Sequence, residues 1–503
     1  MPPEKTKTDQ NPAQEPRWFW IMFFALTVFV YFFGLTIPLL GPDEPRYAQV
    51  AREMFERGDW ITPTLGGFNW FEKPALLYWF EISAYYIFGV TEFAARIGSA
   101  ICGLGTVACF WLIGRYALND KGAANWLAML AASTIGIIVF SRGASFDIIV
   151  TLPITASLAG FIIYELNQNK PRLALFCFYF FIGVALLAKG LIGLVFPVAI
   201  VGLFYLLTRR FPGRDLIYSA LWGVPLLIIV ASVWYVPMYL KHGNTFIDEF
   251  IIQQHFQRFT SNKYQHPQPF YFFLWVLPLM TLPWMPFFLI NVWRQVKTLI
   301  GRFKGSNELA NETDAAHSLQ NFAWAWLLVP LVFFSFSGSK LPGYILPAVP
   351  AAVILAAIQA LSLVQKRPAV ANWLKAIAVS TFVGVVAAII FIVPSFARTE
   401  TDKWLFETAN AKGHSRLQVA GLFTLSHNAE FYAAGRLIRD ADGKQHKFYG
   451  VREIRDYIIA HDQQPLLVLI PHEYVKVLTG NDLVEAKVLE ENGELAIAVV
   501  TAK

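Results

Sequence analysis

Long apolar stretches separated by short polar loops recur along this chain from Trp18 to Pro394. A helix needs roughly 20 mostly apolar residues to cross a bilayer, and most of the stretches approach that length. They lie at 18–40, 76–90, 94–116, 123–142, 147–165, 173–188, 190–208, 216–239, 270–292, 320–337, 343–364 and 369–394. The pattern predicts an all-α polytopic membrane protein in which 76–90 is a surface helix.

The charge of the loops between these stretches predicts their orientation. Lysine and arginine collect in alternate loops, and the basic loops of membrane proteins are typically cytoplasmic. The clusters are Lys5, Lys7 and Arg17; Arg115 and Lys121; Lys170 and Arg172; Arg209, Arg210 and Arg214; Arg294, Lys297, Arg302 and Lys304; and Lys366 and Arg367. With all six clusters in the cytoplasm the chain crosses eleven times, and the loops 41–75 and 240–269 lie on the opposite side.

The overall composition supports a membrane protein and removes one alternative. Hydrophobic residues make up 56% of the 503 residues and charged residues only 15%, against about 25% charge in a soluble domain. A net charge of +6 could indicate a nucleic-acid partner. We exclude nucleic acid because the basic residues lie in short loops between apolar stretches. The polar segment 1–17 is expected to be a cytoplasmic tail, followed by a retained first helix.

The chain changes character after Arg398, where charged residues become more frequent and apolar runs shorter. The predicted elements are strands at 416–425 and 465–470, an amphipathic helix at 450–461 and a hairpin at 484–499. The hairpin is expected to turn at Asn492-Gly493, a strong turn signal. A small α/β domain at 395–503 therefore follows a transmembrane region at 18–394. It shows no cluster of catalytic residue types, so we expect a structural or substrate-shaping cap.

The loops opposite the cytoplasm carry charges that are costly near the membrane and so often mark a site. The first group is Gly41-Pro42-Asp43-Glu44-Pro45-Arg46-Tyr47, directly after the first helix. A carboxylate here could act as a base or pair with a bound cation, or it could simply be solvated at the interface. Glu72 and Lys73 precede Pro74, which favours an extended backbone. They point to different partners or form a local ion pair.

Further charges lie in later loops on the same side. His255 and Arg258 are three residues apart, so a helix would place them on one face; the histidine could bind a metal or be an ordinary surface residue. Lys189 and Lys340 each lie in a short turn with glycine, which suits phosphate binding or snorkelling to the interface. Together with Lys73 and Arg258 they predict an electropositive cavity for an anionic lipid head such as a polyprenyl phosphate. Soluble nucleotides are disfavoured because no phosphate-binding glycine loop stands between a strand and a helix.

At these residues the chain resembles the bacterial aminoarabinose transferase (ArnT) branch of the polyprenyl-phosphate-dependent GT-C glycosyltransferases, which are related to protein O-mannosyltransferases. The matching stretches, in family order, are GPDEPRYAQVAREMFERGDWITPTLGGFNWFEKP at 41–74, SFD at 145–147, AKG at 188–190, HFQRF at 255–259, LPW at 282–284 and SKLPGYILP at 339–347. They cover most of the membrane part, and the run 41–74 is quite specific. Gly343 departs from the pattern, since a larger polar residue is expected there.

The resemblance implies a GT-C fold with about 11–13 transmembrane helices and a periplasmic cavity for the sugar donor. Asp43 matches the catalytic aspartate, and Asp147 matches a further acid of the cavity. Lys73 and Arg258 match residues that hold the donor phosphate. Glu72 and His255 resemble a divalent-metal site, expected to hold zinc. The remaining expected substrate-binding residues are Arg46, Tyr47, Lys189, Lys340 and Tyr344.

The function implied is that of a monomeric, inverting glycosyltransferase of the bacterial inner membrane. It would move a sugar, by default 4-amino-4-deoxy-L-arabinose, from undecaprenyl phosphate to a lipid A phosphate on the periplasmic side. One alternative keeps the donor class but passes another aminosugar or a hexose to a protein or glycan hydroxyl. An alternative of another class is a lipid or sugar transporter. A transporter predicts charges buried within helices and repeats in two halves, whereas the charges here lie at helix ends.

Overall fold

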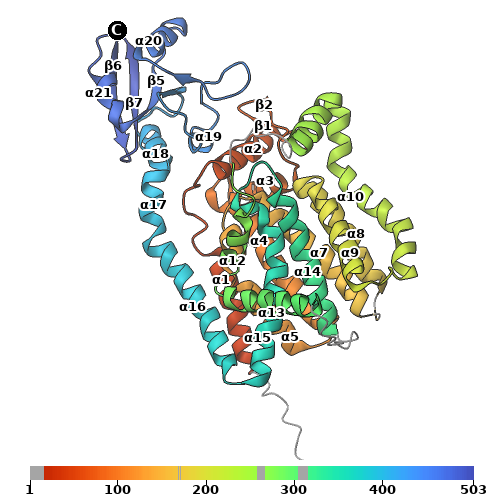
Figure 1. The fold of residues 1–503 in the computed structure, drawn as a ribbon. Helices are drawn as coiled ribbons and strands as arrows, with labels where there is room; N and C mark the ends of the chain where they lie inside the picture. The colour runs from red at the N-terminus through yellow and green to blue at the C-terminus, as the bar shows by residue number, and fades with distance from the viewer. Residues whose placement is uncertain (1–15, 168, 170, 258–266, 304–314) are drawn as a thin grey trace, which may run out of the picture. The chain divides into compact units, whose positions relative to one another are not determined.

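The computed structural model describes residues 16–167, 169, 171–257, 267–303 and 315–503 (Figure 1). The chain divides into two compact units. The first, which we call the helical unit, comprises 1–33, 99–142 and 146–386. The second, which we call the mixed unit, comprises 34–98, 143–145 and 387–503. The domain boundaries predicted at residues 17 and 394 stay predictions.

Helices occupy all the predicted apolar stretches. Those formed by a single long stretch are α1 Arg17–Phe32, α4 Glu92–Leu112, α7 Phe146–Leu166, α8 Pro171–Lys189, α9 Ile192–Thr208, α10 Arg214–Phe246, α14 Ala315–Ser335, α15 Val349–Lys366 and α16 Val370–Phe391. Within the described ranges, seven helical segments are long and apolar enough to cross a membrane, and α1 and α9 are apolar but shorter. The prediction of an all-α polytopic membrane region is therefore confirmed.

Two predicted stretches are broken into pairs of short helices. The stretch 123–142 forms α5 Lys121–Ala132 and α6 Ile135–Phe140, and 270–292 forms α12 Phe272–Met280 and α13 Met285–Phe303. The first break is at Ser133-Thr134, whose hydroxyls donate to carbonyls one turn earlier, an arrangement that often bends helices. The second contains Pro283, which lacks the N–H that a continuous helix needs.

The predicted exterior loops contain more helix than the sequence analysis expected. Segment 41–75 forms α2 Asp43–Arg57 and a small hairpin of β1 Thr64–Leu65 and β2 Phe68–Asn69, before α3 Leu76–Phe88. Segment 240–269 is helical up to Gln257 apart from a kink at Gly243, because the end of α10 runs into the π-helix η2 Ile247–Gln257. Both segments therefore contain helix, and their place between membrane crossings stays a prediction. The α3 helix is not among the segments long enough to span a membrane.

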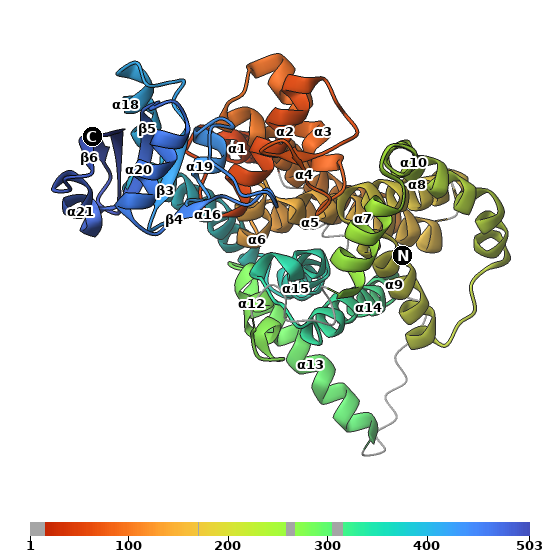
Figure 2. The same cartoon turned by 90° about the horizontal axis from the view of Figure 1, so that it is seen from above.

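The helical unit is held together by packing between neighbouring long helices. Helix α7 packs along α8, which also contacts α9 and α10, and α9 packs against α14 (Figure 2). The short 3-10 helix η3 Pro342–Ala348 precedes α15 and packs against α7 and α14. This packing brings the beginning of α7, which holds Asp147, close to η3, which holds Tyr344.

The C-terminal part of the mixed unit is a five-stranded sheet with the order β4-β3-β5-β7-β6. Its strands are β3 Val419–Leu422, β4 Lys447–Phe448, β5 Leu466–Pro471, β6 Val484–Glu491 and β7 Leu495–Ala502, and its helices are α17 Val393–Glu400, α18 Lys403–Ala411, α19 Ala429–Tyr432, α20 Val451–Ala460 and α21 Val475–Thr479. The β3 strand is parallel to β4 and β5, whereas β7 is antiparallel to β5 and β6. The predicted helix, the second strand and the hairpin through Asn492-Gly493 are confirmed; the first strand is shorter than expected.

Both faces of this sheet are covered, because apolar residues alternate between two cores. Along β5, Leu466 and Val468 pack in the core with α20, while Leu467 and Leu469 pack in the core with α18 and α19. Alternate residues of a strand point to opposite faces, so a strand that is apolar at every position belongs in a central place. The expected small α/β domain is confirmed.

Candidate functional site

Asp43 is the first residue of α2, where the helix dipole favours a carboxylate. Its side chain is about half exposed (49%) and accepts an ion-pair hydrogen bond from Arg46 one turn later at 2.5 Å. The guanidinium of Arg46 also lies over the Trp70 ring, 5.5 Å from its centroid. Arg46 and the helix therefore orient the Asp43 carboxylate while leaving it accessible to a substrate.

Tyr47 and Glu72 belong to the same group. Burial, and then the negative charges of Asp43 and Glu72, raise the pKa of the Tyr47 hydroxyl well above its usual value. The hydroxyl therefore stays protonated and can act as a hydrogen-bond donor. Glu72 and Lys73 are partly buried in the turn between β2 and α3. The structure thus brings Asp43, Arg46, Tyr47 and Glu72 together in the mixed unit.

Glu44, the second carboxylate of the motif, has a structural role that the sequence analysis missed. The buried guanidinium of Arg96 donates to both of its oxygens, Nε to Oε1 at 3.1 Å and Nη2 to Oε2 at 2.6 Å. The backbone N–H groups of Leu40 and Ala144 donate to the same carboxylate at 3.0 and 2.7 Å. Arg96 also donates to the carbonyls of Leu35, Ile37 and Pro38. The pair therefore fixes the chain that leads into Asp43.

A second group of predicted residues lies in the helical unit. Asp147 is in the first turn of α7 and Lys189 is the last residue of α8, the helix ends that favour each charge. The two side chains form an ion pair, and both are mostly buried. The Lys189 ammonium also lies 5.1 Å from the centroid of the Tyr344 ring in η3. Three segments that are distant in sequence thus meet at one polar cluster.

The hydrogen bonds of Lys340 go to backbone carbonyls and not to the Asp147–Lys189 pair. Its side chain is buried, and its ammonium donates to the carbonyls of Ser337 at 2.6 Å and Gln268 at 3.1 Å. These bonds hold the turn before η3 against the segment that precedes α12. The role of Lys340 in substrate binding stays a prediction.

The structure describes only some of the residues predicted to bind metal and the donor phosphate. Arg258 and the side chain of His255 lie outside the described residues. Among those that the structure describes, no group of three or more His, Cys, Asp and Glu residues could hold a metal, whereas zinc sites use three or four protein ligands. The zinc site formed by Glu72 and His255 stays a prediction, as does the meeting of Asp43, Lys73 and Arg258 in one cavity.

The C-terminal part of the mixed unit contacts α2, the helix that carries Asp43. Helix α19 packs against α2. The Tyr432 hydroxyl accepts the N–H of Leu39 at 2.8 Å and contacts Glu92 at 3.2 Å, and Lys403 pairs with Glu92 at 2.8 Å. Partial burial and the charge of Arg46 lower the pKa of His427, so this imidazole is neutral at pH 7. The C-terminal residues therefore help to shape the surroundings of Asp43.

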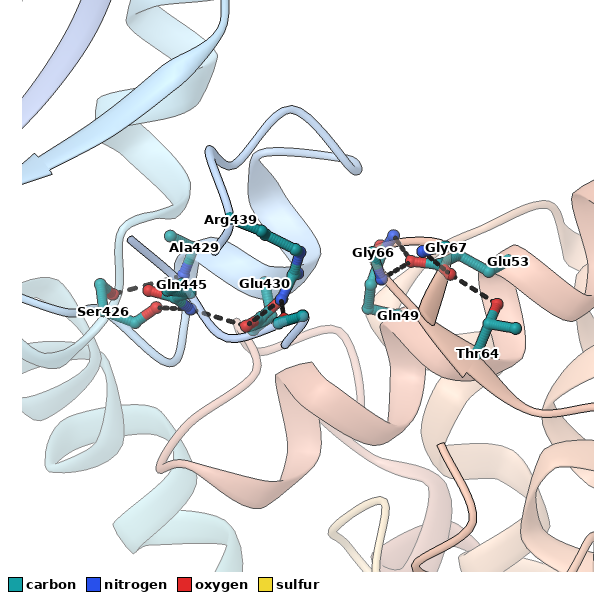
Figure 3. A network of polar contacts seen from close by, with 11 residues as sticks. Gln49, Glu53, Thr64, Gly66, Gly67, Ser426, Ala429, Glu430, Arg439 and Gln445 are labelled. Atoms are coloured by element: carbon teal, nitrogen blue, oxygen red, sulfur yellow. Dashed lines mark hydrogen bonds and ion pairs between the residues drawn. The ribbon is translucent and has the colours of Figure 1, made fainter. Parts of the chain in front are cut away.

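Two polar networks support the contact between the C-terminal part of the mixed unit and the segment that begins with α2 (Figure 3). In the first, Glu53 of α2 accepts from the Thr64 hydroxyl at 2.7 Å and from the N–H groups of Gly66 and Gly67 at 2.6 and 3.1 Å. In the second, the buried carboxylate of Glu430 accepts from Arg439 and from Gln445. The first network fixes the β1–β2 hairpin, and the second fixes the C-terminal loop that packs on it.

Gly66, in the turn of the β1–β2 hairpin, packs against the side chain of Arg439. Substitution of Gly66 should therefore weaken the packing of the C-terminal loop on this hairpin. Gly66 and Gly67 both have positive φ, so alanine strains either by about 1–2 kcal/mol. A Cβ at Gly66 would in addition lie 1.9 Å from Nε of Arg439, whereas Gly67 has nothing within 4 Å. We expect Gly66→Ala to speed proteolysis of the C-terminal segment in the intact protein more than Gly67→Ala does. Equal rates would contradict this contact.

Asp402, which precedes α18, should make the stability depend on pH. It is 2% exposed, and burial raises its pKa to about 6 although Ser426 donates to it. The folded state therefore binds more protons than the unfolded state between about pH 4 and 6, so stability falls by up to about 3 kcal/mol as pH rises through this window. Asp402→Asn should raise the unfolding temperature at pH 7 but not at pH 4. An equal change in unfolding temperature at pH 7 and pH 4 would contradict a raised pKa for Asp402 in the folded protein.

Comparisons with known proteins agree with the membrane fold. Residues 21–247 match the family model described as dolichyl-phosphate-mannose-protein mannosyltransferase. The undecaprenyl phosphate-α-4-amino-4-deoxy-L-arabinose arabinosyl transferases of Yersinia enterocolitica and Aeromonas hydrophila are each 32% identical, over 67% and 66% of this chain. The chain spans 58% and 59% of the length of these relatives. The crystal structure of ArnT from Cupriavidus metallidurans bound to undecaprenyl phosphate has a TM-score of 0.76 at 21% identity, covering 95% of this chain and 97% of that one.

The fold defines the class: this is a polytopic membrane protein with the GT-C fold and a small C-terminal α/β domain. Within that class the chain is ArnT-like, in sequence as well as in fold. The resemblance drawn from the motifs between 41 and 347 is thereby confirmed.

Proposed function

We propose that this protein transfers 4-amino-4-deoxy-L-arabinose from undecaprenyl phosphate to a phosphate of lipid A. The similarity to transferases named for that donor carries the proposal, and the undecaprenyl phosphate in the Cupriavidus structure supports a lipid-phosphate ligand for this fold. The active site and the C-terminal domain face the periplasm in this proposal, because the basic loops belong in the cytoplasm. The membrane is the bacterial inner membrane, and the protein acts as a monomer.

Transfer occurs in one displacement at the anomeric carbon. The bond from this carbon to the donor phosphate breaks, an acceptor oxygen forms the new bond, and the configuration inverts. Lys73 and Arg258 stabilise the negative charge on the departing lipid phosphate. Bound donor and acceptor react as if within one molecule, which removes much of the entropic barrier. Zinc held by Glu72 and His255 would add to the positive charge at the phosphate, but no step depends on it.

Asp43 acts on the other side of the reacting carbon. A lipid A phosphate is already an anion at pH 7, so it needs no base. The carboxylate then stabilises the positive charge that develops on the sugar ring. For an acceptor hydroxyl, the same carboxylate would take the proton as the new bond forms. The arrangement of Asp43 beside Arg46, half exposed at a helix N-terminus, suits either acceptor.

Mass spectrometry of lipid A tests the choice of sugar and acceptor. Cells that carry the gene should contain lipid A heavier by one aminoarabinose, and cells without it, or with Asp43→Asn, should not. A protein or glycan modified in its place would support the hydroxyl-acceptor alternative. No sugar transfer by purified protein in detergent would favour a transporter and overturn the proposal.

A further inference from the structure

Gly343, the second residue of η3, lies directly against the carboxylate of Asp147. A Cβ atom at this position would stand 1.9 Å from Oδ2 and 2.7 Å from Cγ of Asp147, and 2.8 Å from Cε1 of Phe140. Real Cβ atoms essentially never come closer than 3.0 Å to such neighbours. The φ angle of Gly343 is not in the left-handed region. Glycine is therefore needed here for space rather than for backbone conformation.

The carboxylate is also held from another side. Oδ1 of Asp147 bonds to the ammonium of Lys189, and that ammonium lies over the ring of Tyr344, the residue after Gly343. Asp147 is thus placed between the backbone of η3 and the end of α8. A side chain at 343 would have to displace the carboxylate, and the ion pair with Lys189 would be broken or rebuilt.

We propose that Gly343 is a positioning residue, which leaves room for the Asp147–Lys189 pair to form a polar subsite beside Tyr344. This subsite accepts hydrogen bonds from hydroxyl or amino groups of the transferred sugar. The inference rests on the proposed function, because it assigns the pair to recognition of that sugar. It also explains why residue 343 is glycine where the family pattern has a larger polar residue. The glycine determines the position of the Asp147 carboxylate and so helps to determine which sugar binds.

Thermal unfolding of the full-length protein in detergent tests the steric part without requiring activity. Gly343→Ala should lower the unfolding temperature by about 3–5 °C. In an Asp147→Ala background the same substitution should lower it by clearly less, because the two closest atoms are gone and only the contact with Phe140 remains. Gly202→Ala is the control: Gly202 lies within α9 with nothing within 4 Å of an added Cβ, so no loss is expected. Equal losses in both backgrounds would overturn the inference.

Kinetics test the role in sugar recognition. Gly343→Ala should raise the KM for the sugar donor about tenfold or more, with a much smaller change in kcat, and should add less than about twofold in the Asp147→Ala background. A merely structural role would reduce the amount of active protein and leave KM unchanged, which contradicts the proposal. If Gly343→Ala alone does not fold, recovery of folding in the double variant supports the proposal, and failure of both contradicts it. An inactive wild-type protein would overturn the proposed function, while the unfolding comparison would still decide the placement of Asp147.

Discussion

Sugar transfer is expected to fall by about 10²- to 10⁴-fold when Asp43 is replaced by Asn. In the proposed mechanism the substitution removes the negative charge next to the reacting carbon, but it keeps the size of the side chain. The amide oxygen of Asn can still accept the hydrogen bond from Arg46, and the position is half exposed, so the fold should persist. The measurement is the initial rate of transfer by purified protein, together with the unfolding temperature.

A matched substitution separates the role of Asp43 from a general effect of lost charge. Asp456 is an exposed carboxylate of α20 that also pairs with a neighbouring arginine. Asp456→Asn should leave the rate within about twofold of wild type, as surface substitutions usually do. Wild-type turnover by Asp43→Asn would remove this residue from the mechanism.

Replacing Glu44 with Ala should destabilise the mixed unit by about 3–5 kcal/mol. The change leaves the buried guanidinium of Arg96 without its carboxylate and removes the acceptor of the Leu40 and Ala144 N–H groups. An uncompensated buried charge costs far more than the ion pair contributes when intact. The loss should appear as a lower unfolding temperature and a lower yield of folded protein.

The same helix offers a control for Glu44. Glu56 pairs with Arg52 in α2 at 2.8 Å, but its side chain is 53% exposed. Exposed pairs of this spacing contribute only about 0.3–0.5 kcal/mol, so Glu56→Ala should leave the unfolding temperature nearly unchanged. Similar losses for the two variants would show that Glu44 and Arg96 do not support the chain before Asp43.

The membrane fold was predictable because the bilayer constrains helix length and loop charge so strongly. Every long apolar stretch proved helical. In the C-terminal domain, strands β3, β5, β6 and β7 were predicted from local pattern and the Asn492-Gly493 turn, whereas the two-residue strand β4 was not. The breaks in 123–142 and 270–292 are harder to predict, because hydropathy does not register a local change in backbone geometry. Helix α2 was missed although its signals were present: two acidic residues in its first turn, and Gly58 in the left-handed conformation after its end.

The candidate site was only partly predictable. Charge at the membrane edge and the family motifs identified Asp43, Arg46 and Glu72, and the structure brings these together. No sequence signal paired Glu44 with Arg96, which is 52 residues away and lies within an apolar stretch. Similarly, the proximity of His427 to Arg46 depends on how the C-terminal loop packs on α2. Such contacts depend on tertiary structure and do not appear in local pattern.

The most direct test of the central claim is a reconstituted reaction with defined components. Purified protein in detergent would be incubated with undecaprenyl-phosphate-linked aminoarabinose and lipid A, and the products analysed by mass spectrometry. We expect aminoarabinose-modified lipid A and free undecaprenyl phosphate in equal amounts from the wild type, and initial rates about 10²- to 10⁴-fold lower for both products from Asp43→Asn. Intact donor after incubation with a folded wild-type protein would contradict the account.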